Sequence, residues 1–246
     1  MLTQFKESVD YIKSRTNVQP TIGIILGTGL GGLVKEIEII DEIEYKDIPN
    51  FPVSTVESHK GKLIFGNLGG KQVVAMQGRF HYYEGYNMKQ VTFPVRVMKL
   101  LGIQRLFVSN ASGGVNPDFE VGEIMIQDDH INMFPEHPLL GKNFDVLGPR
   151  FPDMSEPYDR KMIEMAKGIA AENNIKVSVG TYAALTGPTF TTGALNTPGV
   201  YTYTAVASDG ICSRTATKVI NVIDLSNCQS LAERVYANGQ TFGSVL

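Results

Sequence analysis

The sequence predicts an α/β fold: a mixed central β-sheet flanked by helices, with the C-terminal part replaced by a β-hairpin-like tail. Short apolar runs that have the character of strands are interspersed with segments of helical periodicity, as in a sheet covered on both faces. Two of these runs end in glycine-rich turns, the positions where such sheets bind ligands. The last 56 residues hold six Asp, Glu, Lys and Arg residues against 41 in the first 190, so the composition changes near residue 190.

The predicted elements follow one another along the first 190 residues. Amphipathic helices are expected at 4–14, 88–101 and 156–173, the last with Pro157 in its first turn. Strands are expected at residues 22–26, 62–66, 72–76, 105–109, 123–127 and 176–185. The proline-containing loop 128–152 is too long for a plain connector, so we expect it to be functional or to form an interface.

Composition and charge exclude several classes of protein. The net charge of −3 and the pI near 5.8 argue against a nucleic-acid-binding surface. No apolar run is long enough for a transmembrane helix, and the first residues lack the pattern of a secretory signal, so we expect a cytoplasmic protein. The chain has two cysteines, and no Cys/His cluster has the spacing of metal ligands.

A glycine-rich stretch, GTGLGG at residues 27–32, directly follows the apolar run 22–26. A strand that ends in such a turn brings backbone N–H groups up to an anion, and the Thr28 hydroxyl adds a donor. The spacing is not that of a nucleotide-binding loop with Lys-Ser/Thr, and it matches the dinucleotide fingerprint only in part. The alternative interpretation is a tight turn selected for steric reasons.

A second motif lies at residues 77–86, QGRFHYYEGY. Arg79 and His81 are two residues apart, so an extended backbone points both toward the same side, where Arg79 offers a planar fork of donors for phosphate. Glu84 is placed to hold the imidazole of His81 in one tautomer or to keep it protonated. The alternative is a surface loop with an Arg–Glu pair.

A third motif, SNASGGVN at residues 109–116, follows the apolar run that ends at Val108. It again places small and polar residues before glycines at the end of a strand, where backbone amides approach a ligand. The alternative is an ordinary turn from strand to loop.

Together these motifs resemble the trimeric purine nucleoside phosphorylases, the family that includes methylthioadenosine phosphorylase. The resemblance covers about residues 1–190. It rests on the order and spacing of the three motifs and of the segments SHKG at 58–61, GPRFPDMS at 148–155 and ALTGPTF at 184–190. The form QGRFH at residues 77–81 is closer to the purine nucleoside branch. The resemblance implies a nucleoside phosphorylase-like domain over residues 1–190 that assembles as a homotrimer.

The resemblance also implies a reaction and a site. Phosphate cleaves a purine (deoxy)ribonucleoside to the free base and α-(deoxy)ribose 1-phosphate; phosphate is a co-substrate, and no cofactor, metal, nucleic acid or membrane is involved. Implied phosphate ligands are Thr28, Arg79, His81 and the Ala111 N–H, and implied catalytic residues are His81, Asn110 and Glu84. Implied ribose and base contacts are Tyr83, Phe151, Phe190 and His59, with Phe151 reaching a neighbouring subunit. The alternatives are core aromatics for the two phenylalanines, a surface aromatic for the tyrosine and a solvated loop residue for the histidine.

The tail, residues 191–246, does not share this resemblance. Polar and apolar residues alternate over 197–207 and 213–222 around an Asp-Gly turn signal, which predicts a hairpin similar to a piece of an Ig-like β-repeat, from a fusion or a misjoined frame. Thr191 stands where the family has a purine-binding Glu, and no segment matches the family's later Met, Ser, Asn and His. We therefore expect impaired activity and cannot assign 6-oxo or 6-amino purine preference; the alternative is a non-catalytic phosphate- or nucleoside-binding remnant or fusion fragment.

Overall fold

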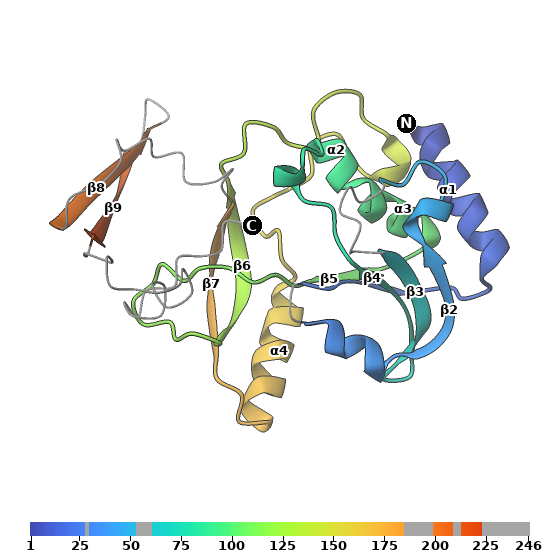
Figure 1. Cartoon of the computed structure of the whole chain (residues 1–246), viewed down its shortest axis with the longest axis horizontal. Helices are drawn as coiled ribbons and strands as arrows, with labels where there is room; N and C mark the ends of the chain where they lie inside the picture. Colours follow the sequence, from blue (N-terminus) through green and yellow to red (C-terminus); the bar gives the residue numbers. More distant parts are fainter. Residues whose placement is uncertain (28–29, 53–60, 185–198, 209–212, 223–246) are drawn as a thin grey trace, which may run out of the picture. The chain divides into compact units, whose positions relative to one another are not determined.

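The structure is a computed structural model, and it describes residues 1–27, 30–52, 61–184, 199–208 and 213–222. The chain divides into two compact units, Met1–Thr186 and Gly187–Val245 (Figure 1). The predicted domain boundary at residue 190 falls in the segment 185–198, which lies outside the described residues, and it stays a prediction.

The first unit is built on a five-stranded mixed sheet with the order β2-β3-β4-β1-β5. Its strands are β1 (Ile22–Ile25), β2 (Glu38–Glu44), β3 (Lys62–Leu68), β4 (Lys71–Gln77) and β5 (Arg105–Val108). Strand β1 is parallel to both of its neighbours, β4 and β5, whereas β3 is antiparallel to both of its neighbours, β2 and β4. The prediction of a mixed central sheet flanked by helices is confirmed.

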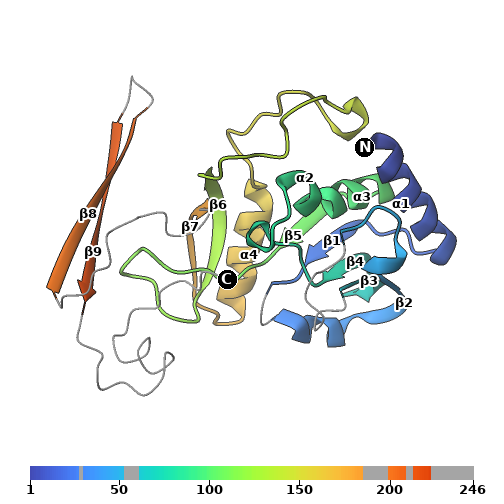
Figure 2. The ribbon, with the colours of Figure 1, turned by 45° about the horizontal axis from the view of Figure 1, so that its top comes forward.

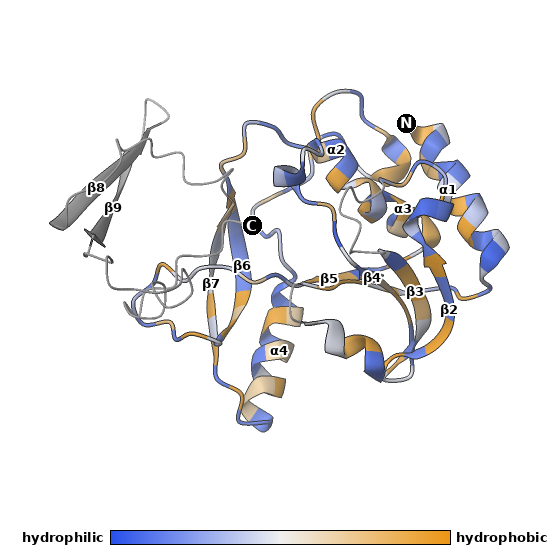
Figure 3. Cartoon of the chain, viewed as in Figure 1, coloured by the Kyte–Doolittle hydropathy of each residue, from blue (hydrophilic) through white to orange (hydrophobic). Residues whose placement is uncertain are grey.

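Both faces of this sheet are covered. Successive side chains of a strand point to opposite faces, so neighbouring residues of one strand belong to different core clusters. Leu63 and Phe65 of β3 join the core cluster that also contains residues of α1 (Leu2–Arg15) and α3 (Phe93–Leu101). Ile64 of β3 joins a second cluster, with Val34 of the 3₁₀ segment η1 (Leu30–Glu36) packed against it. Figure 2 shows α1 and α3 on one side of the sheet, and Figure 3 shows that β3 and β4 are largely apolar. Burial on both faces explains why β4 is apolar without interruption from Val73 to Met76.

The single helix predicted at 88–101 is wrong in one respect, because the structure has two helices there. These are α2 (Met88–Val91), capped by a reciprocal pair of hydrogen bonds between Asn87 and Gln90, and α3. Pro94 lies in the first turn of α3. It has no N–H to donate to the preceding turn, so a continuous helix through this point would lose a backbone hydrogen bond.

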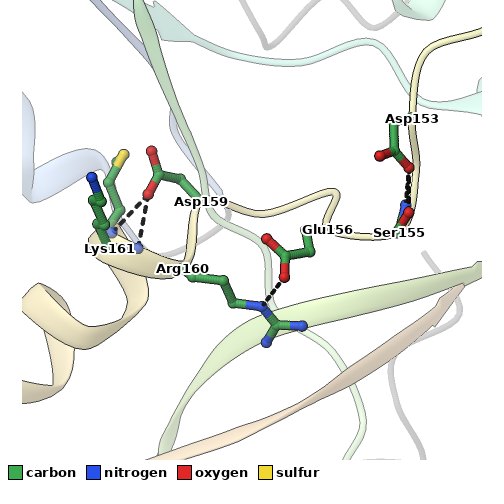
Figure 4. Close-up of polar contacts among 7 residues, drawn as sticks. Asp153, Ser155, Glu156, Asp159, Arg160 and Lys161 are labelled. Carbon is green, nitrogen blue, oxygen red and sulfur yellow. Dashed lines mark hydrogen bonds and ion pairs between the residues drawn. The ribbon is translucent and has the colours of Figure 1, made fainter.

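Helix α4 (Arg160–Glu172) begins later than the predicted residue 156. The side chain of Asp159 accepts hydrogen bonds from the backbone N–H groups of Lys161 (2.9 Å) and Met162 (3.1 Å), as Figure 4 shows. An N-cap of this kind satisfies donors that the first helical turn leaves free, so it sets the start of the helix. Pro157 therefore precedes the helix and does not lie in its first turn.

A separate two-stranded parallel sheet pairs β6 (Ile124–Asn132) with β7 (Val177–Ala184). Strand β6 is longer than the predicted 123–127, because a register shift between Gln127 and Asp129 lets pairing continue to Asn132. The connection predicted to start at residue 128 therefore starts after Asn132. The remaining short 3₁₀ elements are η2 (Tyr45–Asp47), η3 (Tyr82–Glu84) and η4 (Asp145–Leu147).

The described part of the second unit is an antiparallel hairpin of β8 (Gly199–Ser208) and β9 (Ser213–Val222). The hairpin predicted from the alternation over 197–207 and 213–222 is thus present. Among the described residues, no helix is long and apolar enough to cross a membrane. Nor does this part of the chain contain a group of three or more His, Cys, Asp or Glu side chains placed to hold a metal ion.

Candidate active site

The three sequence motifs begin at one edge of the five-stranded sheet. In the register of the parallel strands, Ile25 of β1 lies opposite both Met76 of β4 and Val108 of β5. Parallel strands run in the same direction, so the segments that follow β1, β4 and β5 all leave the sheet at its carboxyl edge. The sheet order places β1 between the other two strands, and this is the edge at which open α/β sheets bind ligands.

At this edge Gly27 lies against the chain that follows β5. Its N–H donates to Ser109 Oγ at 3.0 Å, and the same hydroxyl donates to the Ile25 carbonyl at 3.2 Å. A Cβ on Gly27 would lie 2.5 Å from the Ser109 carbonyl oxygen and 2.9 Å from the Asn110 Cα. Only glycine fits at this separation, so the first glycine of the motif is required by the close approach of two backbones.

Arg79 projects from the segment after β4 to the same place. Its Nη1 donates to the Ser109 carbonyl oxygen at 3.0 Å, which uses one of the five N–H donors of the guanidinium. The side chain is half-buried, and burial lowers the pKa of Arg79, an effect that Tyr83 and Tyr182 partly oppose. Arginine remains charged in proteins, so a partly desolvated cation stands beside the backbone at 109–111.

His81, Tyr83 and Glu84 form a second group next to Arg79. The Nδ1 of His81 contacts the Glu84 carboxylate, and the His81 ring stacks on the Tyr83 ring with centroids 4.8 Å apart. The pKa of Tyr83 is raised by burial and by Glu84, and lowered by Arg79. The carboxylate accepts from Nδ1–H, so the imidazole is held in one orientation with Nε2 left as its other polar atom. Glu84 thus partners His81, in place of the Arg79–Glu84 surface pair that was the alternative.

The segment after β5 supplies the third part of the site. Asn110 Nδ2 donates to the Ala111 carbonyl at 3.3 Å, and Asn110 Oδ1 accepts from Gln127 Nε2 at 3.4 Å. Gln127 in turn accepts at Oε1 from the Tyr158 hydroxyl at 2.7 Å. This segment is therefore connected both to β1, through Ser109, and to β6.

Comparison with known proteins assigns the chain to a family. The model of the phosphorylase superfamily matches residues 21–210. Purine nucleoside phosphorylase 1 of Geobacillus stearothermophilus is 53% identical over 192 residues, which cover 78% of this chain and 70% of that protein. The purine nucleoside phosphorylase of Bos taurus is 47% identical over 195 residues, covering 77% and 68%. The chain belongs to the purine nucleoside phosphorylase family.

Solved structures agree with this family. Isoform 2 of the purine nucleoside phosphorylase of Schistosoma mansoni, in complex with cytosine and ribose-1-phosphate, superimposes with a TM-score of 0.72 at 46% identity. The match covers 76% of this chain and 68% of that one. The family resemblance stated from the sequence is confirmed. The match of the family model runs past the expected limit at residue 190 and ends at residue 210, after β8.

The structure brings some of the predicted site residues of the phosphorylase together and leaves others apart. Arg79, His81, Tyr83, Glu84, Asn110 and Ala111 lie at the carboxyl edge of the sheet, in the segments that follow β4 and β5. Phe151 is 85% exposed and contacts the Arg150 guanidinium, 5.4 Å from its ring centroid, so within one chain it is no core aromatic. Thr28, His59 and Phe190 lie outside the described residues, and their roles stay predictions.

Three residues that connect the site were not predicted from the sequence. Ser109 is the first residue of the third motif, and a hydroxyl directly after the last residue of β5 is a signal that could have indicated the link to β1. Gln127 and Tyr158 carry no such local signal, because they meet only through tertiary packing across 31 residues.

Proposed function

We propose that this chain is a purine nucleoside phosphorylase that transfers the ribosyl group of a purine nucleoside to phosphate. The observation that carries the proposal is the position of the Arg79 guanidinium at the carboxyl edge of β4-β1-β5. It donates to the Ser109 carbonyl, at the point where the backbones of Gly27 and Ser109 lie in close contact. The names of the relatives, purine nucleoside phosphorylases at 53% and 47% identity, support the same activity. Two related structures contain ribose-1-phosphate, which is the product that such a reaction gives.

The proposed reaction breaks the bond between the anomeric carbon and the purine nitrogen. The bonding electrons leave with the purine, which takes up a proton, and a phosphate oxygen forms the new bond to the anomeric carbon. The departing base leaves positive charge on the sugar, and a bound phosphate dianion on the opposite face stabilises it. Because the new bond to the anomeric carbon comes from phosphate, we propose phosphate as the second substrate. The step is a substitution without a change of oxidation state, and we propose no further cofactor.

Within this proposal Arg79, His81 and the Ala111 N–H hold phosphate. A charged, forked donor and a backbone amide suit the oxygens of a tetrahedral anion. The contact between His81 and Glu84 fixes the imidazole so that Nε2 faces the ligand, while Tyr83, stacked on that ring, is placed for the ribose. Thr28 is proposed as a further phosphate ligand because it follows Gly27 directly.

We further infer a homotrimer in which Phe151 enters the ribose pocket of a neighbouring subunit. Support comes from the 85% exposure of this ring, since a large aromatic side chain is costly to leave in water. An exposed aromatic that completes a second subunit's site gains burial on assembly. The cytoplasmic location remains a prediction from the sequence.

We find no counterpart in residues 191–246 for the residues with which the family binds the purine base. We propose that the chain turns over purine nucleosides more slowly than a chimera in which these residues are replaced by the segment of the Geobacillus stearothermophilus relative that follows its match. Loss of one well-placed polar contact costs roughly 10²–10³ in rate, and at least two are unmatched here. A substitution of Thr191→Glu alone should not restore the rate.

The test of the proposed function is an assay with inosine and phosphate on the purified full chain. Hypoxanthine release that requires phosphate and saturates with its concentration would support the proposal. Release that is independent of phosphate, or no release by either the chain or the chimera, would contradict it.

A further inference from the structure

A chain of side-chain hydrogen bonds joins the segment after β5 to β6 and to the residues before α4. It runs through Tyr158, Gln127 and Asn110 and ends on the backbone carbonyl of Ala111, with separations of 2.7, 3.4 and 3.3 Å. Asn110 and Ala111 belong to the proposed phosphate site, whereas Gln127 and Tyr158 come from elements that the sequence did not connect with it.

The direction of this chain follows from its last member. A backbone carbonyl can only accept a hydrogen bond, so the Asn110 amide must turn its Nδ2 toward Ala111. Its Oδ1 is then the atom that faces Gln127, which must present Nε2. The Gln127 Oε1 consequently faces Tyr158, whose hydroxyl must donate. A single unambiguous acceptor thus fixes the orientation of two amides that could otherwise be reversed.

Tyr158 is suited to be the donor at the start of the chain. Burial raises the pKa of Tyr158, and Asp129 and Tyr182 raise it further, so the phenol keeps its proton at neutral pH. Its ring also packs edge-on against His130, with centroids 5.9 Å apart and an interplanar angle of 90°. The ring is therefore fixed by packing while the hydroxyl serves the hydrogen bond.

We propose that Tyr158 and Gln127 are positioning residues, which hold the Asn110–Ala111 segment in the conformation that binds phosphate. This inference rests on the proposed function, because it assigns a consequence to a segment whose role is phosphate binding. Neither residue touches the ligand in this scheme. They act by keeping Asn110 Oδ1 toward Gln127 and Asn110 Nδ2 toward the Ala111 carbonyl. This orientation secures the backbone at Ala111, whose N–H donates to the anion in the proposed site.

The first experiment removes the hydroxyl of Tyr158 and keeps its ring, as Tyr158→Phe. Loss of one neutral hydrogen bond corresponds to roughly a 2- to 10-fold change in an equilibrium constant, so we expect phosphate binding to weaken by about that factor in calorimetry. KM for phosphate should rise by the same factor, with KM for inosine unchanged. The matched control is Tyr11→Phe in α1, which should leave both unchanged.

A second variant, Gln127→Glu, reverses the direction of the hydrogen bond between residues 127 and 110 and keeps the size and shape of the side chain. In Gln127→Glu the ionised carboxylate still accepts from Tyr158 but has no donor for Asn110, so the Asn110 amide turns over and releases Ala111. We expect a larger loss of phosphate affinity than in Tyr158→Phe. If Tyr158→Phe fails to fold, as judged by thermal unfolding, Gln127→Glu carries the same test.

Side-chain amide resonances in ¹⁵N NMR spectra separate this inference from the proposed function. Tyr158→Phe should shift the amide signals of Asn110 as well as those of Gln127, although the hydroxyl that is removed donates to Gln127 and not to Asn110. This readout needs no turnover. If neither the chain nor the chimera cleaves inosine, the proposed function fails, while the spectra and phosphate binding still decide whether Tyr158 and Gln127 position the Asn110–Ala111 segment. Unchanged Asn110 signals and unchanged phosphate affinity in both variants would overturn it.

Discussion

Arg79 and Ser109 are joined by a hydrogen bond of 3.0 Å from Nη1 to the backbone carbonyl oxygen, and this contact spans the end of an intervening strand. Arg79 follows β4 and Ser109 follows β5, and β1 lies between these two strands in the sheet. The guanidinium thus connects two motifs that are not neighbours in the sheet, beside the glycine that ends β1. The phosphate half of the proposed site is organised around this one cation.

We expect Arg79→Ala to weaken phosphate binding by roughly 1.5–3 kcal/mol, the range for a hydrogen bond to a charged group. Isothermal titration calorimetry with inorganic phosphate measures this directly. Arg79→Lys is the matched control, because it keeps the charge and loses the planar fork, and its affinity should fall between the two. Equal affinities of wild type and Arg79→Ala would show that phosphate binds elsewhere.

Gly27→Ala should destabilise the fold as well as the site. The new Cβ would lie 2.5 Å from the Ser109 carbonyl oxygen, and both partners are backbone, so one segment must move. We expect a loss of roughly 1–3 kcal/mol in the free energy of unfolding, measured by urea denaturation. Gly31→Ala is the control in the same motif, since a Cβ there meets nothing within 4 Å. Equal midpoints for the two variants would refute the close-approach argument.

Glu84→Gln tests whether the carboxylate orients His81. The substitution preserves size and removes the charge at the His81 Nδ1 contact, so we expect kcat/KM for phosphate to fall by roughly 10-fold or more. The control is Glu42→Gln, which removes a surface ion pair with Lys62 at 2.7 Å and should have no effect on kcat/KM. An effect of similar size in both variants would indicate a general electrostatic cause.

Much of the fold could be predicted because its signals are local. The apolar runs of β1, β3 and β4 and the glycines after β1 are readable along the chain, since burial on both faces needs continuous apolar residues. Strand β2 was missed for the opposite reason. It lies at the edge of the sheet, acidic residues interrupt its pattern, and Ile39 and Ile40 are exposed by 43% and 51%.

The candidate site likewise has a part that the local sequence predicts and a part that depends on tertiary packing. Arg79, His81 and Glu84 share one short segment, so the spacing of their side chains indicated a common location. The hydrogen bonds from Tyr158 to Gln127 and onward to Asn110 depend on how β6 and the chain before α4 pack, which no local pattern encodes. Helix α4 shows this limit at a single boundary, because the Asp159 cap outweighed the preference of Pro157 for a first turn.

Phe151 should report on assembly. Light scattering of the full chain is expected to give three times the monomer mass of 27.0 kDa. In Phe151→Ala we expect KM for the nucleoside to rise and the free energy of unfolding to change by less than about 0.5 kcal/mol, because the ring is 85% exposed within one chain. A monomer of full stability would contradict the assignment of this residue to a neighbour's site.

The most direct test of the central claim is the fate of phosphate during cleavage of inosine by the full chain, followed by ³¹P NMR spectroscopy. We expect a ribose 1-phosphate signal that grows in step with hypoxanthine and is lost in Arg79→Ala. Hypoxanthine accompanied by free ribose, with the inorganic phosphate signal unchanged, would show that water is the acceptor and would contradict phosphorolysis.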